Sequence, residues 1–349
     1  MTLREQLAAF WAGERPDQIP YTIYQSKLPP VDRPVVQGMF ANGLGVTCFV
    51  PTWEVTYHAS IDMRDDVTLR DGVRHRRQTW RTPLGEIDAT WVEDWHQTYF
   101  LETAEDYRVM TYIVEHTAIE PAYESFLAQD AALPPYAVAV PRMGRTPLQT
   151  ILVDYAGLGN LALHLYEYEE EVRALYEALL AQFRRHIEIV AGGPGRYINV
   201  LENFTAETLG PRRYREFLLP VYEECFPVLQ GAGKIVGCHY DGQTAVVKDL
   251  IAAAPIDLIE SLTPPPEGDL TLAEARAAWP DKLFWAHINL GCYDLPAAEL
   301  RRLVLERIEE AAPDGRRLAF EVSEQLPARW LESMPVVLDA LAEARACFA

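Results

Sequence analysis

Short apolar runs recur from Tyr197 to the C-terminus, and each one ends in a side chain that can take part in chemistry. The stretches between the runs have the periodicity of amphipathic helices. Strands joined by helix-length crossovers are parallel, and in a closed barrel their carboxyl ends meet at one mouth, where such folds keep their active sites. The residues that follow or end the runs, and would share that mouth, are Glu202, His239, Asp241, Glu260, Asn289, Ser323 and Glu324.

The length and composition favour one large α/β domain. With 349 residues and 49% hydrophobic content, the chain can bury the core of a single (β/α)8 TIM-type barrel. We therefore expect one domain over residues 1–349, with the main barrel over residues 103–349. Residues 20–101 are rich in Thr, Val, Tyr and Trp, which predicts an N-terminal β-rich insertion near the mouth.

Two local signals support this division. Strand-like runs on either side of Pro83-Leu84-Gly85 predict a β-hairpin within residues 73–91. Thr103, followed by a helical pattern, is a plausible N-cap. The insertion is therefore expected to end where the helix begins.

The charge and cysteine content exclude several classes of partner. A formal net charge of −20 without a Lys/Arg-rich stripe argues against binding to nucleic acid or to an anionic membrane. No apolar run reaches the roughly 20 residues of a membrane span, and the first residues lack the pattern of a signal peptide. The five cysteines are scattered without CxxC spacing. This usage is typical of a reducing compartment, so we expect a cytoplasmic protein.

The sharpest local signal is Gly237-Cys238-His239-Tyr240-Asp241-Gly242. In an extended segment His239 and Asp241 project to the same side, where one divalent cation could take an imidazole nitrogen and a carboxylate oxygen. The same spacing also suits a His–Asp hydrogen bond that orders a loop. The motif alone favours neither interpretation.

Three acidic residues at other strand ends strengthen the metal interpretation. Glu202, Glu260 and Glu324 would crowd one pocket without Arg or Lys, and a bound cation or raised pKa values would relieve their repulsion. Each of them alone is more typical of a helix cap or a solvated loop. Together they favour a site, for which Glu324 is a candidate metal ligand and Glu202, Glu260 and His239 are candidate catalytic residues.

A substrate pocket is predicted around His96 and Asn289. His96 lies in an aromatic-rich stretch and could line a pocket for a planar substrate, although a histidine among aromatic residues is more often simply packed. Motifs for dinucleotides, for nucleoside triphosphates and for serine hydrolase or HExxH metalloprotease chemistry are absent from the sequence.

At these residues the chain resembles the uroporphyrinogen decarboxylase superfamily, which also contains cobalamin-dependent methyltransferases. The resemblance implies a (β/α)8 barrel with its site at the C-terminal mouth. True uroporphyrinogen decarboxylases carry an N-terminal arginine-rich motif, whereas residues 20–37 hold only Lys27 and Arg33 as basic groups. The motifs that carry the resemblance are Arg81-Thr82-Pro83-Leu84-Gly85, Glu202-Asn203-Phe204-Thr205, Gly210-Pro211-Arg212-Arg213-Tyr214, His239-Tyr240-Asp241-Gly242, Glu260 with Pro264-Pro265-Pro266-Glu267-Gly268-Asp269, and Ser323-Glu324-Gln325-Leu326-Pro327.

The methyltransferase branch of this superfamily holds zinc with a His-x-Cys pair and a later cysteine. In this chain His239 and Asp241 stand at the pair, and the later position falls near Ser323 and Glu324. Both thiolates are therefore replaced. Oxygen ligands bind zinc less selectively, and Glu324 or Glu260 becomes the candidate third ligand.

The leading hypothesis is a metal-dependent, corrinoid-linked methyltransferase or demethylase. A divalent metal, most simply zinc, would act as a Lewis acid on a small methylated substrate or methyl acceptor, opposite a cobamide supplied by a corrinoid partner protein. One rival is a metal-independent decarboxylase or lyase of a small non-porphyrin acid. The other is a non-catalytic barrel that binds a corrinoid or tetrapyrrole.

Overall fold

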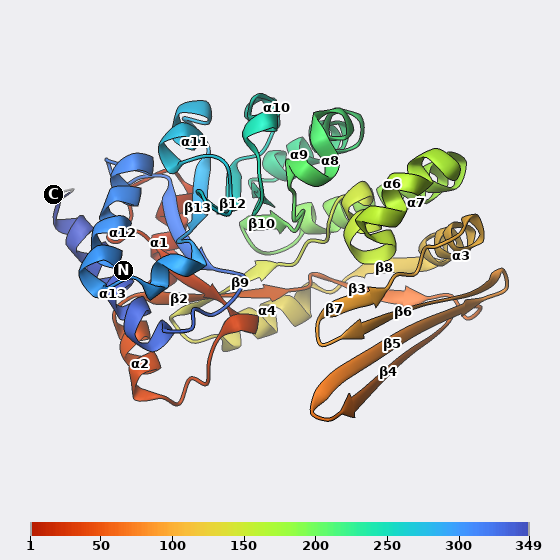
Figure 1. Ribbon diagram of the computed structural model, residues 1–349, viewed down its shortest axis with the longest axis horizontal. Helices are drawn as coiled ribbons and strands as arrows, with labels where there is room; N and C mark the ends of the chain where they lie inside the picture. The colour runs from red at the N-terminus through yellow and green to blue at the C-terminus, as the bar shows by residue number, and fades with distance from the viewer. Residues whose placement is uncertain (1, 348–349) are drawn as a thin grey trace. The chain divides into compact units, whose positions relative to one another are not determined.

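The computed structural model describes residues 2–347, which form two compact units (Figure 1). The first unit contains the residues up to Thr52, Tyr123–Met143, and the residues from Val190 on. The second contains Trp53–Ala122 and Gly144–Ile189. The single domain predicted over residues 1–349 and the place of its insertion near the mouth stay predictions.

The first unit is built on an eight-stranded parallel sheet with helices between its strands. The order of the strands is β10-β11-β12-β13-β14-β1-β2-β9, and a parallel bridge between Arg142 and Asn199 joins the two edge strands. The predicted TIM-type architecture is confirmed at this level. The strands are β1 (Tyr21–Tyr24), β2 (Leu44–Val50), β9 (Ala137–Pro141), β10 (Tyr197–Val200), β11 (Ile235–His239), β12 (Leu258–Leu262), β13 (Leu283–His287) and β14 (Leu318–Val322).

The helices of this unit follow the strands in the alternation that the sequence predicts. They are α1 (Leu3–Trp11), η1 (Gln25–Lys27), α2 (Pro34–Ala41), α4 (Tyr123–Ala132), α8 (Ala206–Arg213), η3 (Tyr214–Leu218), α9 (Leu219–Gly231), η4 (Ala245–Val247), α10 (Lys248–Ala253), α11 (Leu272–Ala278), η5 (Leu290–Asp294), α12 (Ala297–Ala311) and α13 (Trp330–Cys347).

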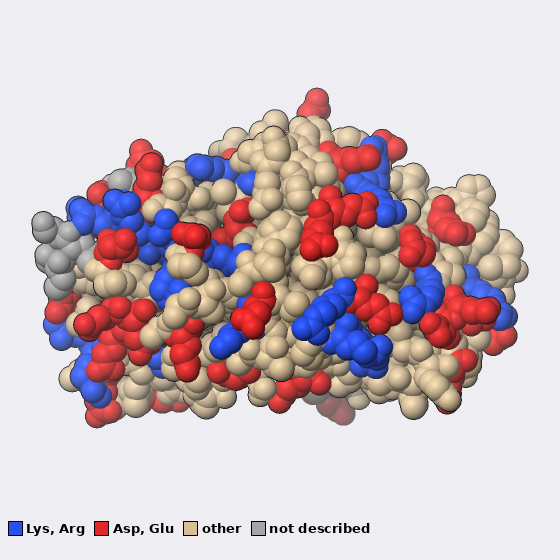
Figure 2. Space-filling view, turned by 90° about the horizontal axis from the view of Figure 1, so that it is seen from above, with Lys and Arg blue, Asp and Glu red and all other residues tan. Residues whose placement is uncertain are grey.

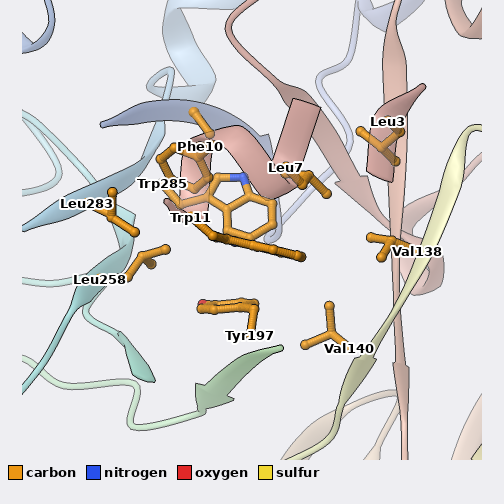
Figure 3. Packing of buried hydrophobic residues seen from close by; sticks show 11 residues of the cluster. Leu3, Leu7, Phe10, Trp11, Val138, Val140, Tyr197, Leu258, Leu283 and Trp285 are labelled. Carbon is orange, nitrogen blue, oxygen red and sulfur yellow. The ribbon is translucent and has the colours of Figure 1, made fainter. Parts of the chain in front are cut away.

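Helix α1 closes the N-terminal end of the barrel. Its buried side chains include Phe10 and Trp11, and the ring of Trp11 stacks on Tyr197 with 5.5 Å between centroids (Figure 3). Trp285 of β13 lies 5.8 Å from Phe10, edge to face. Gly237 leaves room for this cluster, because a Cβ there would lie 2.6 Å from the Tyr197 hydroxyl. This end of the barrel is a packed apolar core.

The second unit contains two antiparallel sheets. The predicted hairpin is confirmed as β5 and β6, in which Thr82 pairs with Gly85. Thr103 caps α3 in a capping box with Asp106, as predicted. The elements of this unit are β3 (Trp53–Tyr57), β4 (Asp62–Arg70), β5 (Val73–Thr82), β6 (Gly85–Val92), β7 (Trp95–Thr98), α3 (Ala104–Glu115), β8 (Thr117–Pro121), α5 (Pro147–Thr150), η2 (Ile151–Ala156), α6 (Gly157–Glu167) and most of α7 (Glu169–Gly192).

One predicted boundary is wrong. The β-rich insertion was expected to start at residue 20, but β1 and β2 belong to the parallel sheet, where Tyr21 pairs with Leu44 and with Phe320. These two strands are short and buried, and a short apolar run does not reveal by itself which sheet it will join. The antiparallel strands begin only at Trp53.

Within the described part of the chain, no helix has the length and apolar character required to cross a bilayer. On the face shown in Figure 2, Lys and Arg side chains are interspersed with Asp and Glu side chains.

Candidate functional site

The carboxyl end of β11 positions His239 and Asp241. His239 is the last residue of the strand, and the chain bends at Gly242. Gly242 lets the chain pass close to Thr205, because a Cβ at residue 242 would lie 2.3 Å from the Cβ of Thr205. Asp241 Oδ2 lies 3.6 Å from His239 Nε2. The sequence expectation that these two side chains lie on the same side therefore agrees with the geometry.

Glu324, which follows β14, joins this pair. Its Oε1 lies 3.4 Å from His239 Nε2, and His239, Asp241 and Glu324 offer one ligand atom each within 4.8 Å of one another. His239 is only 2% exposed, and its Nε2 is buried without a hydrogen-bond partner. A buried imidazole nitrogen that faces two carboxylates without a hydrogen bond is a chemically suitable start for a cation site.

The spacing of these atoms fits a metal better than a hydrogen bond. Separations of 3.4 and 3.6 Å exceed an ordinary hydrogen bond to the imidazole. Ligand atoms about 2.1 Å from a tetrahedral ion are about 3.4 Å apart, which is close to both separations. Three protein ligands with a fourth position open is the arrangement of catalytic zinc sites, and the two carboxylates beside one imidazole make this set richer in oxygen than the usual zinc sets.

Glu260 holds the other nitrogen of the same ring. Its Oε2 lies 2.5 Å from His239 Nδ1, and its Oε1 accepts a hydrogen bond from the hydroxyl of Tyr24. Glu260 is buried and pairs in register with His239 across β11 and β12. A carboxylate in this position fixes the proton on Nδ1 and directs the Nε2 lone pair toward the ligand site. The structure therefore favours Glu260 as a support for His239 over Glu260 as the third ligand.

The charges of this cluster are strongly coupled. Burial alone would lower the pKa of His239, but the carboxylates of Glu260, Asp241 and Glu324 raise that pKa well above its usual range. His239 in turn lowers the pKa of Glu324 and, against the effect of burial, the pKa values of Asp241 and Glu260. Three carboxylates thus face one imidazole ring. A divalent cation that replaced the Nε2 proton would reduce the excess of negative charge.

A further buried acid, Glu321, lies on β14, two strands from Glu260, and was not selected from the sequence. Its Oε1 accepts a hydrogen bond of 3.1 Å from the backbone N–H of Ser261 and lies 3.1 Å from the Ser261 hydroxyl, while its Oε2 is buried without a partner. Burial and the charge of Glu260 raise the pKa of Glu321 well above its usual range. These surroundings therefore favour the protonated form of Glu321.

A network of hydroxyl groups connects Glu321 with His287, another residue that was not selected. The Ser261 and Ser323 hydroxyls lie 2.9 Å apart, and Ser323 Oγ lies 2.7 Å from His287 Nε2. His287 Nδ1 lies 3.1 Å from the hydroxyl of Thr263. The sequence did carry a signal for Glu321 and His287, because a charged or ionisable residue inside an otherwise apolar run must have a partner once the strand is buried.

A cavity of about 400 Å³ adjoins these groups. Asp241, Glu324, His287 and Ser323 line it, as does Asn289, which the sequence placed in a substrate pocket. Asn289 donates hydrogen bonds to the carbonyl of Pro264 at 2.7 Å and to the carboxylate of Glu267. The volume is within the range of small-molecule sites.

Glu202 faces a different set of residues. It is fully buried, and its Oε1 accepts a hydrogen bond of 2.8 Å from Tyr222, which is linked through Tyr240 to Tyr214. Burial, with Glu202 nearby, raises the pKa of the Cys238 thiol. Within the described part of the chain, the ligand group formed by His239 does not include Glu202. The catalytic role given to Glu202 stays a prediction.

His96 belongs to the second compact unit. Its ring stacks on Tyr99 with 4.3 Å between centroids and lies 4.6 Å from the ring of Trp91. Burial lowers the pKa of His96. These contacts match the packed arrangement that was the alternative for this residue, and its place in a substrate pocket stays a prediction.

Comparisons with known proteins add a likeness of fold. No protein-family model matches the chain, and no curated protein matches it either. Among solved structures, a methyltransferase from Methanosarcina mazei is 11% identical, covers 100% of this chain and 99% of its own, and superposes with a TM-score of 0.58. This likeness supports the barrel architecture. Membership of the uroporphyrinogen decarboxylase superfamily stays a prediction.

Two other solved structures are less similar. One, of the pneumococcal virulence factor StrH, is 10% identical over 95% of this chain and 84% of that chain, with a TM-score of 0.39. The other, muconate cycloisomerase from Pseudomonas fluorescens, is 12% identical over 84% and 78%, with a TM-score of 0.26. Neither carries an argument about this protein.

Proposed function

We propose that this protein is a metal-dependent methyltransferase, or a demethylase of the same type, that moves a methyl group between a heteroatom of a small substrate and a cobamide on a partner protein. The observation that carries the proposal is the buried Nε2 of His239, which faces Asp241 and Glu324 without a hydrogen bond. The fold likeness to a methyltransferase and the resemblance in the sequence motifs support methyl transfer as the reaction.

The residues of the chain would prepare this site in three ways. Glu260, fixed by Tyr24, holds the Nδ1 proton of His239 and keeps the Nε2 lone pair available. Asp241 and Glu324 supply two anionic oxygens. A divalent metal held by these three ligands would supply a Lewis acid that polarises the heteroatom or lowers its pKa.

The cavity favours this function over the rival decarboxylase or lyase. Among the described residues that line it there are four carboxyl groups, from Asp241, Glu267, Glu321 and Glu324, and neither Lys nor Arg. A substrate carboxylate would find no cationic side chain there to replace its hydration. A neutral or cationic substrate that binds through a heteroatom suits the lining better.

Metal content is the first test. Protein purified without a metal-affinity tag should contain about one equivalent of divalent metal by elemental mass spectrometry, and His239→Ala and Asp241→Ala should lose it. His164→Ala is a matched control, because His164 is also a buried histidine but pairs with the hydroxyl of Tyr107 in the second unit. Wild-type protein that takes up no metal, even on reconstitution, would refute the proposal.

Methyl transfer is then measured with free methylcobalamin as donor and a panel of small thiols and phenols as acceptors. The metal-loaded protein should accelerate the loss of methylcobalamin, and the metal-stripped protein should not. A protein that binds metal and cobalamin without turnover would instead match the non-catalytic barrel.

A further inference from the structure

An unbroken chain of hydrogen bonds runs between two buried ionisable groups of the barrel. It starts at Glu321 Oε1, which is 3.1 Å from Ser261 Oγ, and continues over 2.9 Å to Ser323 Oγ. It ends at His287 Nε2, 2.7 Å further on. All four side chains are buried, and Glu321, Ser323 and His287 line the cavity of about 400 Å³.

The hydrogens of this network can be counted. Beyond His287 the network continues from Nδ1 to the Thr263 hydroxyl at 3.1 Å, which donates to the Ser261 carbonyl at 2.8 Å. Five hydrogen bonds of 3.1 Å or less are thus made, beside a longer contact of 3.5 Å between Ser323 Oγ and Glu324 Oε1, whereas three hydroxyls and a neutral histidine supply only four hydrogens for the five. The fifth hydrogen is a proton on Glu321 or on His287.

The surroundings place this proton on Glu321 at rest. Burial and the charge of Glu260 raise the pKa of Glu321, whereas burial and the charge of His239 lower the pKa of His287. The charged groups that act on the pair come from β11, β12 and the loops that follow β11 and β14, namely His239, Glu260, Asp241 and Glu324. Tyr24 and Tyr197, on β1 and β10, stay neutral because burial raises their pKa values.

The backbone of β12 is shaped for this network. The register between β12 and β13 shifts between Glu260 and Leu262, and Ser261 has a φ of 57°, in the left-handed region. Strict alternation would turn Ser261 away from the interior that Glu260 faces. The irregularity instead directs both the N–H and the hydroxyl of Ser261 onto Glu321. Bulges beside active sites commonly redirect a side chain in this way.

We propose that Glu321, Ser261, Ser323 and His287 form a proton relay that opens on the cavity. In one state Glu321 carries the proton and both hydroxyls donate toward His287. In the other His287 carries it and both hydroxyls donate toward Glu321. The shared proton stands on the geometry alone, while its use in turnover rests on the proposed function.

The relay would balance the chemistry of methyl transfer. The bond between heteroatom and methyl carbon breaks with its electron pair left on the heteroatom, and the methyl carbon bonds to the reduced cobamide, which supplies the electron pair of the new bond. The heteroatom takes the proton of His287 Nδ1 in place of the Thr263 hydroxyl, which lies 3.1 Å from that nitrogen. The proton of Glu321 then reaches His287 Nε2 through the two serines, and water reprotonates Glu321 when the product leaves. For a methyl acceptor the steps run in reverse: Glu321 first gives its proton to water and then takes the proton of the heteroatom through the same network.

Infrared spectroscopy tests the shared proton without substrate or metal. The protein at pH 7 should show a protonated carboxylic acid band that Glu321→Gln removes and Glu306→Gln, on the exposed face of α12, does not. The band should shift in Ser323→Ala, although Ser323 does not contact Glu321, because the Ser261 hydroxyl loses its partner. Ser333→Ala is the matched control, since the buried Ser333 hydroxyl bonds only to the Arg329 carbonyl. Glu321 that is ionised at pH 7, or a band indifferent to Ser323→Ala, would overturn the relay.

Turnover supplies the second readout. In the methylcobalamin assay, Ser323→Ala should lower kcat about 100-fold with little change in KM, and Ser323→Thr, which keeps a hydroxyl, should restore most of the loss. Equal kcat for Ser323→Ala and wild type would also contradict the relay. The infrared result does not depend on methyl transfer. If the protein lacks that activity, the infrared measurement still shows whether Glu321 and His287 share a proton.

Discussion

The two ends of the parallel barrel are built from opposite kinds of side chain, although the same strands supply both. At the amino ends, Leu258 of β12 and Trp285 of β13 pack with α1 in an apolar cluster (Figure 3). At the carboxyl ends, Glu260 lies only two residues beyond Leu258, and His287 only two beyond Trp285. A single step along the inward-facing positions of a strand therefore separates packing from chemistry.

This contrast indicates how a barrel can keep ionisable groups buried. Each buried carboxyl group at the carboxyl end costs free energy unless it is paired, because it loses its hydration. The cluster at the other end stabilises the fold by the burial of apolar surface, and the few polar atoms that it buries belong to the rings of Trp11, Tyr197 and Trp285. Substitutions at the two ends should therefore have separable effects, on the free energy of unfolding at one end and on metal affinity at the other.

The largest effect is expected at the apolar end. Phe10→Ala should lower the free energy of unfolding by about 3–5 kcal/mol, because it leaves a cavity where a fully buried ring now contacts Trp285. Denaturant titration measures the loss, and elemental analysis of the folded protein should still find about one metal per chain. A Phe10→Ala variant that keeps its stability but loses its metal would show that the two ends of the barrel do not have separate effects.

At the polar end, Glu260→Gln should weaken metal binding by about 10- to 100-fold, since the amide no longer holds the Nδ1 proton of His239 as a carboxylate does. Competition with a chromophoric chelator gives the affinity. Glu306→Gln, an exposed substitution on α12, should leave it unchanged. An unaltered affinity in Glu260→Gln would show that the carboxylate does not prepare the ligand.

Metal affinity should rise with pH across the neutral range. The pKa of His239 is raised, so the metal-free protein holds a proton on Nε2 that the metal must displace, whereas Asp241 and Glu324 are already ionised because their pKa values are lowered. One released proton corresponds to about a tenfold gain in affinity per pH unit. Calorimetry in buffers of different ionisation enthalpy counts the protons, and a count of zero would mean that His239 is not a ligand.

The smallest effect on stability is expected for Glu324→Ala. The Glu324 side chain is 56% exposed, so its loss from the metal-free protein should change the free energy of unfolding by no more than about 0.5 kcal/mol. Its metal affinity should nevertheless fall. A large loss of stability with full metal binding would mean that Glu324 stabilises the fold and does not bind the metal.

The sequence predicted much of this arrangement because the parallel-strand pattern is local. Apolar runs that end in His239, Glu260 and Asn289 mark the carboxyl ends of strands, and parallel strands bring such ends together. The hairpin and the Thr103 cap were also readable, since each depends on a few adjacent residues. That β1 and β2 belong to the parallel sheet could not be predicted, because a strand pairs with residues that are distant in the sequence.

The support of the site could not be predicted for a similar reason. Ser261 joins Glu321 only because β12 carries an irregularity with a left-handed residue, and strict alternation predicts the opposite orientation for that side chain. The hydroxyl of Tyr24 donates a hydrogen bond to Glu260, although the two residues are 236 positions apart in the sequence. Neither contact can be recognised from the residues adjacent to it in the sequence.

The most direct measurement is a crystal structure of the metal-loaded protein with anomalous data collected on both sides of the metal absorption edge. The account predicts one anomalous peak about 2.0–2.2 Å from His239 Nε2 and from one carboxylate oxygen each of Asp241 and Glu324. The hydrogen bond between His239 Nδ1 and Glu260 should remain in place. A peak bound elsewhere, or an Nε2 without a metal within bonding distance in metal-saturated crystals, would contradict it.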